Sequence, residues 1–191
     1  MSTRKHAWGL PLFCLKFVVI LVVLEAGWLL LLPYYGNALV QVAGVPLRYG
    51  LGVPIEAGRI EADGILNWET RMIFTIDKHE RAMPIAELAA NVPPYIALVL
   101  ATAGLTWKRR GRILAYGLGI LCAFHVLFII VALRFQDALM QVSEIPVAVI
   151  QFFITLPFML WIVFAYWDRL LSLGLDKPAS PPDKTPPPAQ D

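Results

Sequence analysis

The chain has 191 residues, of which 58% are hydrophobic and only 16% are charged, and its mean hydropathy is +0.65. Soluble domains are about 45–50% apolar and about 25% charged, so this composition excludes both an ordinary soluble protein and a wholly disordered one. Two cysteines are too few for a disulfide scaffold, and a net charge of +2 argues against nucleic acid as the main partner.

Four apolar stretches come near the roughly 20 residues that a helix needs to cross a bilayer. After a short N-terminal segment, 1–10, we predict transmembrane helices at 11–32, 93–107, 113–133 and 145–167. The first is predicted to be an uncleaved anchor, because no small-x-small cleavage site follows it. The second is short, and a re-entrant hairpin is the alternative for it. The basic block that follows it favours a true crossing.

The region 33–92 is the only part large enough to form structure outside the bilayer. In chain order we predict a surface helix, a hairpin, a further strand and a short helix: Asn37–Gly44, then Arg59–Ala62 paired with Ile65–Trp68 around Asp63-Gly64, then Thr70–Ile76, then Ile85–Asn91. The predicted fold class is therefore an α-helical integral membrane protein with four transmembrane helices and a small, partly β extracytoplasmic insert after the first helix.

The distribution of Lys and Arg predicts the orientation of these helices. A basic loop, 108–112, contains Lys108, Arg109, Arg110 and Arg112. With the N-terminal segment and the tail 168–191 it holds more than half of the 16 basic residues, so these parts are expected in the cytoplasm. The insert and the loop 134–144, richer in acids, are then outside. The four cations are also candidates for lipid headgroup contact, at about 1 kcal/mol each, although the topology rule alone explains them. The proline-rich tail is predicted to be disordered.

A carboxylate and an imidazole fall inside the predicted helices. Glu25 lies near the middle of the first helix, and His125 lies at a similar depth in the third. A charged side chain is costly in lipid, so Glu25 must face protein, form a pair or stay protonated. We therefore predict a contact between Glu25 and His125, direct or through water, that joins two helices. A proton relay is the alternative, although it would need a longer series of such groups.

Two cysteines offer a second candidate chemistry. Cys122 lies three residues before His125, on the same helical face, as a thiol nucleophile would require. The third helix offers no Asp or Asn to orient the histidine, and membrane cysteines are often packing residues. Cys14 is predicted at another depth, so we expect no disulfide. The exposed run at His79 offers too few metal ligands, and we expect no cofactor or metal.

Small residues recur every four positions in two of the predicted helices: Ala97 and Ala101 in the second, and Ala115, Gly119 and Ala123 in the third. Such spacing permits close approach of helices in a membrane, and Gly117 widens the small face of the third helix. We therefore predict that the second and third helices pack as a tight hairpin.

The order of one span, a small outer region and three further spans is similar to that of one known family. The similarity is carried by Asn91–Thr102 (NVPPYIALVLAT) followed by Lys108-Arg109-Arg110, and by Trp28, Leu31, Pro33 and Tyr34 at the end of the first helix. On these residues the chain resembles the exosortase-associated membrane proteins of Gram-negative bacteria, nearest to the type encoded beside the exosortase H class. The resemblance covers most of the chain except the tail.

The resemblance implies an accessory partner of an exosortase-like transpeptidase in the bacterial inner membrane. An exosortase itself uses Cys, Arg and His at the outer face, whereas Cys122 is predicted in mid-span without a matching Arg, so this chain does not resemble the transpeptidase. We expect a non-enzymatic accessory protein of a protein-sorting or envelope-biogenesis system, with the bilayer and a membrane protein as partners. The alternatives are a small membrane enzyme or proton-coupled subunit using Glu25 and His125, and a structural subunit of a larger membrane complex.

Overall fold

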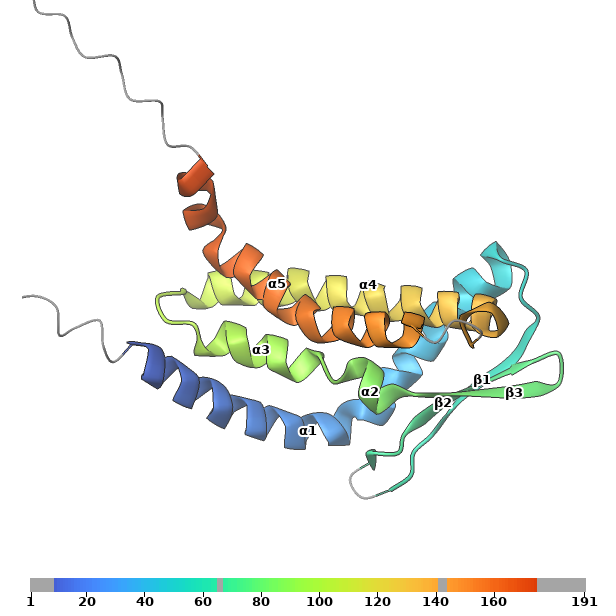
Figure 1. The fold of residues 1–191 in the computed structure, drawn as a ribbon. Helices are drawn as coiled ribbons and strands as arrows, with labels where there is room; N and C mark the ends of the chain where they lie inside the picture. The colour runs from blue at the N-terminus through green and yellow to red at the C-terminus, as the bar shows by residue number, and fades with distance from the viewer. Residues whose placement is uncertain (1–8, 65–66, 141–143, 175–191) are drawn as a thin grey trace, which may run out of the picture.

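The computed structural model describes residues 9–64, 67–140 and 144–174 and is mostly helical (Figure 1). The helical elements are α1 (Gly9–Val45), the π-helical turn η1 (Pro46–Gly50), α2 (Ile85–Ala89), α3 (Val92–Ala101), α4 (Trp107–Met140) and α5 (Glu144–Gly174). Three strands, β1 (Ile55–Glu61), β2 (Arg71–Ile76) and β3 (His79–Pro84), form an antiparallel sheet at one end of the helices (Figure 1). Of the two predicted terminal segments, residues 1–8 and 175–191 lie outside the described part.

The helix α1 is longer than predicted. It contains Pro33 and continues through the region where a break and a separate surface helix were expected. A proline inside a helix costs about 3 kcal/mol. Burying Leu32, Leu39 and Val40 outweighs that cost, because each large apolar side chain contributes about 1.5–3 kcal/mol. At about 1.5 Å per residue the helix is roughly 55 Å long, well beyond the thickness of a bilayer core of about 30 Å.

The sheet has the order β1-β2-β3, and its pairing differs from the predicted hairpin. β1 pairs with β2, from Ile55 opposite Ile76 to Glu61 opposite Arg71. The prediction that Asp63-Gly64 forms a two-residue hairpin is therefore wrong. Trp68 lies in the connection between β1 and β2, and residues 65–66 of the expected partner strand are outside the described part. β2 takes the central position because its apolar side chains point to both faces of the sheet.

The actual two-residue hairpin joins β2 to β3. Ile76 pairs with His79, and the two residues between them, Asp77 and Lys78, have φ angles of 48° and 65°. Positive φ at both central residues is characteristic of the type I′ turn, which matches the twist of the flanking strands. Neither residue is glycine, and β3 is largely polar, so no local pattern predicts this hairpin.

One face of the sheet is buried against the C-terminal part of α1. This cluster consists of Leu32, Leu39, Val40 and Ala43 of α1, Leu47 of η1, Ile55, Met72, Phe74 and Ile76 of the sheet, Ile85, Leu88 and Ala89 of α2, and Ile129 and Leu133 of α4. Gly58 permits the close approach, because a Cβ at that position would lie 2.5 Å from Cγ1 of Val40. The opposite face carries the buried Ile73 and an exposed ion pair, in which the Arg59 guanidinium binds both carboxylate oxygens of Glu80, at 2.8 and 3.2 Å.

The basic block belongs to a helix rather than to the predicted loop. α4 begins at Trp107, and the N–H groups of Arg109 and Arg110 donate to the side-chain and backbone oxygens of Thr106. The block therefore occupies the first turns of α4. The helix also passes the predicted end at residue 133, with a kink at Phe135. α5 contains the whole predicted fourth helix, including Pro157.

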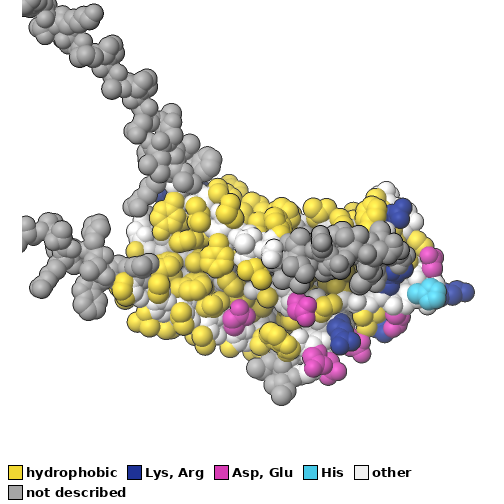
Figure 2. Space-filling model, viewed as in Figure 1, with side chains coloured by type: hydrophobic (Ala, Val, Ile, Leu, Met, Phe, Trp, Pro, Cys, Tyr) yellow, Lys and Arg dark blue, Asp and Glu magenta, His cyan; other side chains and the backbone are white. Residues whose placement is uncertain are grey.

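Among the described residues, two helical segments are long and apolar enough to cross a membrane: Pro11–Gly50 and Trp107–Phe135. Only 6% of the most apolar window of the first is buried inside the structure, and 28% of that of the second. The core helix of a soluble protein would be mostly buried, so these surfaces suit lipid better than water. Ile85–Ala101 and Gln151–Tyr166 are shorter apolar helices. Figure 2 shows hydrophobic side chains over the helices, with charged side chains mainly toward the sheet end and a few acidic ones over the helices.

The close contact between α3 and α4 is at Gly117 rather than at the four-residue repeat of small residues in α4. Ala97 and Ala101 are buried, whereas Ala115, Gly119 and Ala123 are exposed. Gly117 is the buried position, and a Cβ there would collide with the ring and hydroxyl of Tyr95. That hydroxyl donates to the carbonyl oxygen of Ile113 at 2.7 Å. The contact therefore lies at Gly117 of the predicted small face and not at its four-residue repeat.

Candidate functional site

The strongest polar feature of the helical part is His125, which is fully buried in α4. Its Nδ1 lies 2.7 Å from the hydroxyl of Tyr35 in α1, and its Nε2 lies 3.0 Å from Oδ1 of Asn91. Asn91 is the N-cap residue of α3, but its side chain caps no backbone N–H. The amide nitrogen of Asn91 instead donates to the carbonyl oxygen of Phe153 in α5, at 3.5 Å.

The donors and acceptors of this group define one direction for every hydrogen bond. Oδ1 of Asn91 only accepts, so Nε2 of His125 carries the hydrogen and donates it. In a neutral imidazole Nδ1 is then an acceptor, and the Tyr35 hydroxyl donates to it. The result is a series of hydrogen bonds that runs from Tyr35 through His125 and Asn91 to the backbone of α5. We refer to Tyr35, His125 and Asn91 as the polar clasp.

The polar clasp joins elements that are far apart in the sequence. It connects α1, α4, the start of α3 and α5, and aromatic rings close around it. The ring of Phe153 stacks on His125 with centroids 5.6 Å apart, and the Tyr35 ring meets His125 edge-on at 5.9 Å. Both nitrogens of the histidine are thus satisfied within a buried site, as a polar group needs to be away from water. The arrangement can hold four helices in one register.

The structure gives His125 different partners from the predicted Glu25. Tyr35 and Asn91 occupy both ring nitrogens, so neither nitrogen remains for the carboxylate. Glu25 is half-buried in α1, ten residues before Tyr35, which is about 15 Å along the helix. The similar depths predicted for Glu25 and His125 were derived from the wrong helix ends. α4 begins earlier than the predicted third helix, and α1 continues past the predicted end of the first. Tyr35 lies beyond the predicted end of the first helix, and Asn91 is the last residue of the predicted short helix.

A cavity of about 410 Å³ lies beside the polar clasp. It is lined by Trp28, Tyr35, Val92, Ile96, Leu118, Gly119 and Cys122. Its walls are almost wholly apolar, and the buried Nε1 of Trp28 has no hydrogen-bond partner among the described residues. Cys122 sits next to the Tyr35 hydroxyl and is a free thiol, as is the exposed Cys14. The histidine beside Cys122 is already bound on both nitrogens, so it is not positioned to take a proton from the thiol.

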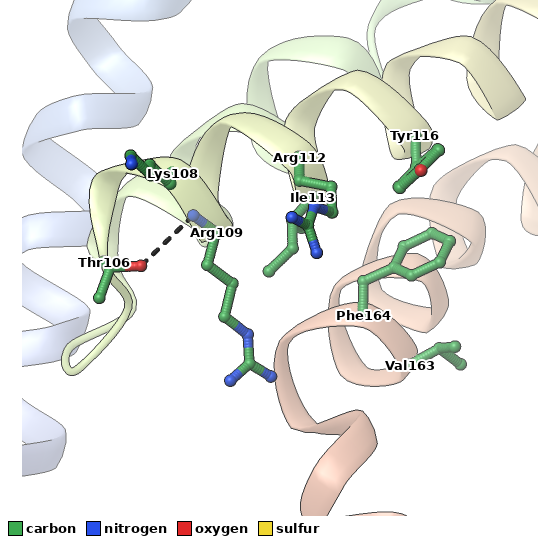
Figure 3. Close-up of a pocket in the computed structure, with 8 residues that line it drawn as sticks. All are labelled: Thr106, Lys108, Arg109, Arg112, Ile113, Tyr116, Val163 and Phe164. Carbon is green, nitrogen blue, oxygen red and sulfur yellow. Dashed lines mark hydrogen bonds between the residues drawn. The ribbon is translucent and has the colours of Figure 1, made fainter.

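The basic block at the start of α4 lies at the end of the bundle away from the sheet, and its side chains occupy two environments. Lys108, Arg109 and Arg112 line a pocket of about 690 Å³ between α4 and α5 (Figure 3). Arg110 lies outside that lining. Its Nη2 donates to the carbonyl oxygen of Thr102 at 2.7 Å, and its guanidinium lies 5.0 Å from the centroid of the Trp107 ring. Of the four predicted headgroup residues, three share a pocket and one closes the turn before α4.

Within residues 9–64, 67–140 and 144–174, no group of three or more His, Cys, Asp or Glu side chains is placed to hold a metal ion. His79 is exposed at the start of β3. Comparison of the chain with protein-family models, with curated proteins and with solved structures gave no match.

Proposed function

We propose that this chain is a non-enzymatic accessory protein of the bacterial inner membrane, acting in an exosortase-like protein-sorting system or in envelope biogenesis. In this arrangement four helices cross the bilayer, both termini are cytoplasmic, and the sheet lies outside. A membrane protein, such as an exosortase-like transpeptidase, is the partner. The proposal depends on the surface of the molecule, on the polar clasp and on the resemblance of its sequence.

The distribution of side chains supports the bilayer arrangement. Hydrophobic residues cover the helices, and the charged groups lie mainly toward the sheet end (Figure 2). α1 begins, and α5 ends, at the end of the bundle away from the sheet (Figure 1). The apolar segment Ile85–Ala101, formed by α2 and α3, is about 25 Å long at 1.5 Å per residue, close to the lower limit for a crossing. The three cations of the pocket then face the cytoplasm, as the topology rule requires.

The single observation that carries a non-enzymatic role is the use of the buried polar groups. His125 donates and accepts one hydrogen bond each, to Asn91 and from Tyr35, and both partners lie on other elements. A proton relay needs groups that exchange partners and a route to water, whereas this histidine is fully buried between fixed partners. The clasp instead supports a rigid bundle that carries the sheet on the extended part of α1.

The sheet is the surface through which an accessory protein of this shape would act. Its inner face is buried on α1, and its outer face carries the Arg59–Glu80 ion pair, whose side chains are 56% and 53% exposed. β1 and β3 are the edge strands, so their outer backbone groups face away from the sheet. Edges of this kind are common sites of pairing with another chain.

Copurification tests the proposal. The full-length chain, tagged at the C-terminus and extracted in mild detergent, should bring down a membrane transpeptidase or a substrate with a C-terminal sorting signal in near-stoichiometric amount. Arg59→Gln should lower that recovery, while Lys16→Gln, which removes the same charge from the other end of the molecule, should not. Recovery of the chain alone as a stable species, or equal loss in both variants, would contradict the proposal.

Glu25 discriminates the accessory role from that of a proton-coupled subunit. Under the accessory role, Glu25→Gln leaves partner recovery and function in cells intact wherever the protein accumulates normally. If the variant accumulates normally but function is abolished, the role belongs to a small membrane enzyme or a proton-coupled subunit.

A further inference from the structure

The pocket between α4 and α5 has two chemically different halves. One half carries three cations, Lys108, Arg109 and Arg112, from the first turns of α4. Among the described residues that line it, none is acidic. Figure 3 shows Arg109 extended from α4 toward α5, where its Nη2 lies 3.5 Å from the carbonyl oxygen of Ala165. The pocket thus concentrates positive charge in a space of about 690 Å³, within the range of small-ligand sites.

The spacing of the cations indicates that an anion belongs among them. Lys108 and Arg112 are four residues apart, so they lie on the same face of α4, where two like charges destabilise a helix. A topology signal requires only that Lys and Arg be present on the cytoplasmic side, and Arg110 meets it while turned toward Thr102. The other three share one pocket, which the topology rule does not require.

The second half of the pocket is apolar and continues away from the cations. It is formed by Ile113 and Tyr116 of α4 and by Val163 and Phe164 of α5. The rings of Tyr116 and Phe164 lie 6.4 Å apart. An inorganic phosphate ion would use only the cationic half. A molecule with a phosphate at one end and an acyl chain at the other would use both.

We propose that this pocket binds an anionic phospholipid, with its phosphate among Lys108, Arg109 and Arg112 and an acyl chain against Tyr116 and Phe164. Basic pockets between transmembrane helices at the cytoplasmic side suit such headgroups. The inference goes beyond the accessory role and rests only on the bilayer arrangement of the helices. A bound lipid would fix α5 against α4 at the end of the bundle opposite the polar clasp.

Native mass spectrometry of the purified full-length protein in neutral detergent tests this site. Phosphatidylglycerol should bind, whereas phosphatidylcholine should bind far more weakly. The double variant Lys108→Gln/Arg112→Gln should bind phosphatidylglycerol about 30-fold more weakly, from about 1 kcal/mol for each cation. Lys16→Gln removes a charge from the same end of the bundle and should change the affinity less than about twofold.

Further competition and mutation experiments distinguish a lipid site from its alternatives. Inorganic phosphate and soluble glycerol phosphate should not displace the lipid. Displacement by either would show that the pocket binds a free anion and would overturn the proposal of a phospholipid site. Equal losses in Lys16→Gln and the double variant would reduce the effect to general electrostatics and overturn the site. The charge-preserving variant Lys108→Arg/Arg112→Lys should retain binding. Loss of binding in this variant would overturn the proposal, even if the double variant to glutamine fails to fold. Failure of phosphatidylglycerol to bind the unmodified protein would overturn the lipid site, whereas the topology of the chain is tested by a separate experiment.

Discussion

Replacing Tyr35 with phenylalanine removes one hydroxyl from the polar clasp and keeps the ring that lies beside Trp28, 5.1 Å away between centroids. The lost hydrogen bond to Nδ1 of His125 is 2.7 Å long and part-buried. Hydrogen bonds between helices in membranes average about 0.6 kcal/mol, with a maximum near 1.7 kcal/mol. An acceptor left unsatisfied in a buried site costs about 1–3 kcal/mol. We therefore expect Tyr35→Phe to lower the free energy of unfolding by about 1–2 kcal/mol.

A double-mutant cycle isolates the contact. His125→Ala removes both hydrogen bonds of the imidazole and its stacking on Phe153, so it should destabilise the protein more than Tyr35→Phe. In the His125→Ala background the Tyr35 hydroxyl has already lost its partner, so Tyr35→Phe costs less there. The two effects should therefore fall short of additivity by about 1 kcal/mol. Glu25→Gln with His125→Ala is the matched control and should be additive within about 0.5 kcal/mol, because Glu25 lies outside the clasp.

The free energies can be measured by unfolding the purified full-length protein in mixed micelles with a denaturing detergent, followed by circular dichroism. A coupling between Tyr35 and His125 below about 0.3 kcal/mol would refute the hydrogen bond. A coupling above about 1 kcal/mol between Glu25 and His125 would restore the contact predicted from the sequence. Either result would remove the argument that the histidine has a structural role.

Two further predictions concern packing and charge. Gly117→Ala should destabilise the protein by about 1–3 kcal/mol in the same unfolding assay, because the new methyl group collides with Tyr95, whereas Gly119→Ala meets no atom within 4 Å and should be neutral or stabilising. Equal effects of the two substitutions would contradict this packing. Arg59→Ala should lower stability by less than about 1 kcal/mol, since its ion pair with Glu80 is half-exposed, and the loss should shrink at high salt. A larger, salt-independent loss would show that the pair is not solvated as described.

The helical framework follows from hydropathy, but the contacts within it do not. The apolar runs place α1, α4 and α5 because a long apolar segment has few other stable forms in lipid. Their ends are less well determined: the basic block was predicted as a loop, yet Lys and Arg are good helix formers and continue α4. The first helix is predicted to end at residue 32, but burial of apolar side chains keeps α1 intact through Pro33.

The sheet and the site depend on contacts between distant segments. Asp63-Gly64 is a strong local hairpin signal, yet β1 pairs with β2 because only β2 is apolar enough for the central position. The polar clasp unites residues 35, 91 and 125, and no local pattern indicates that register. A buried histidine always needs partners for both nitrogens, so a search for Tyr or Asn at the helix ends would have offered Tyr35 and Asn91 as candidates.

The proposed bilayer arrangement requires the two ends of the bundle to lie on opposite sides of the membrane. Single cysteines at the β2–β3 turn (Lys78→Cys) and between α3 and α4 (Ala103→Cys), in a background of Cys14→Ser and Cys122→Ala, can be probed in spheroplasts with a membrane-impermeant maleimide. We predict that Lys78→Cys is labelled at once and Ala103→Cys only after the membrane is permeabilised. Labelling of both without permeabilisation, or the reverse order, would contradict the arrangement of the molecule proposed above.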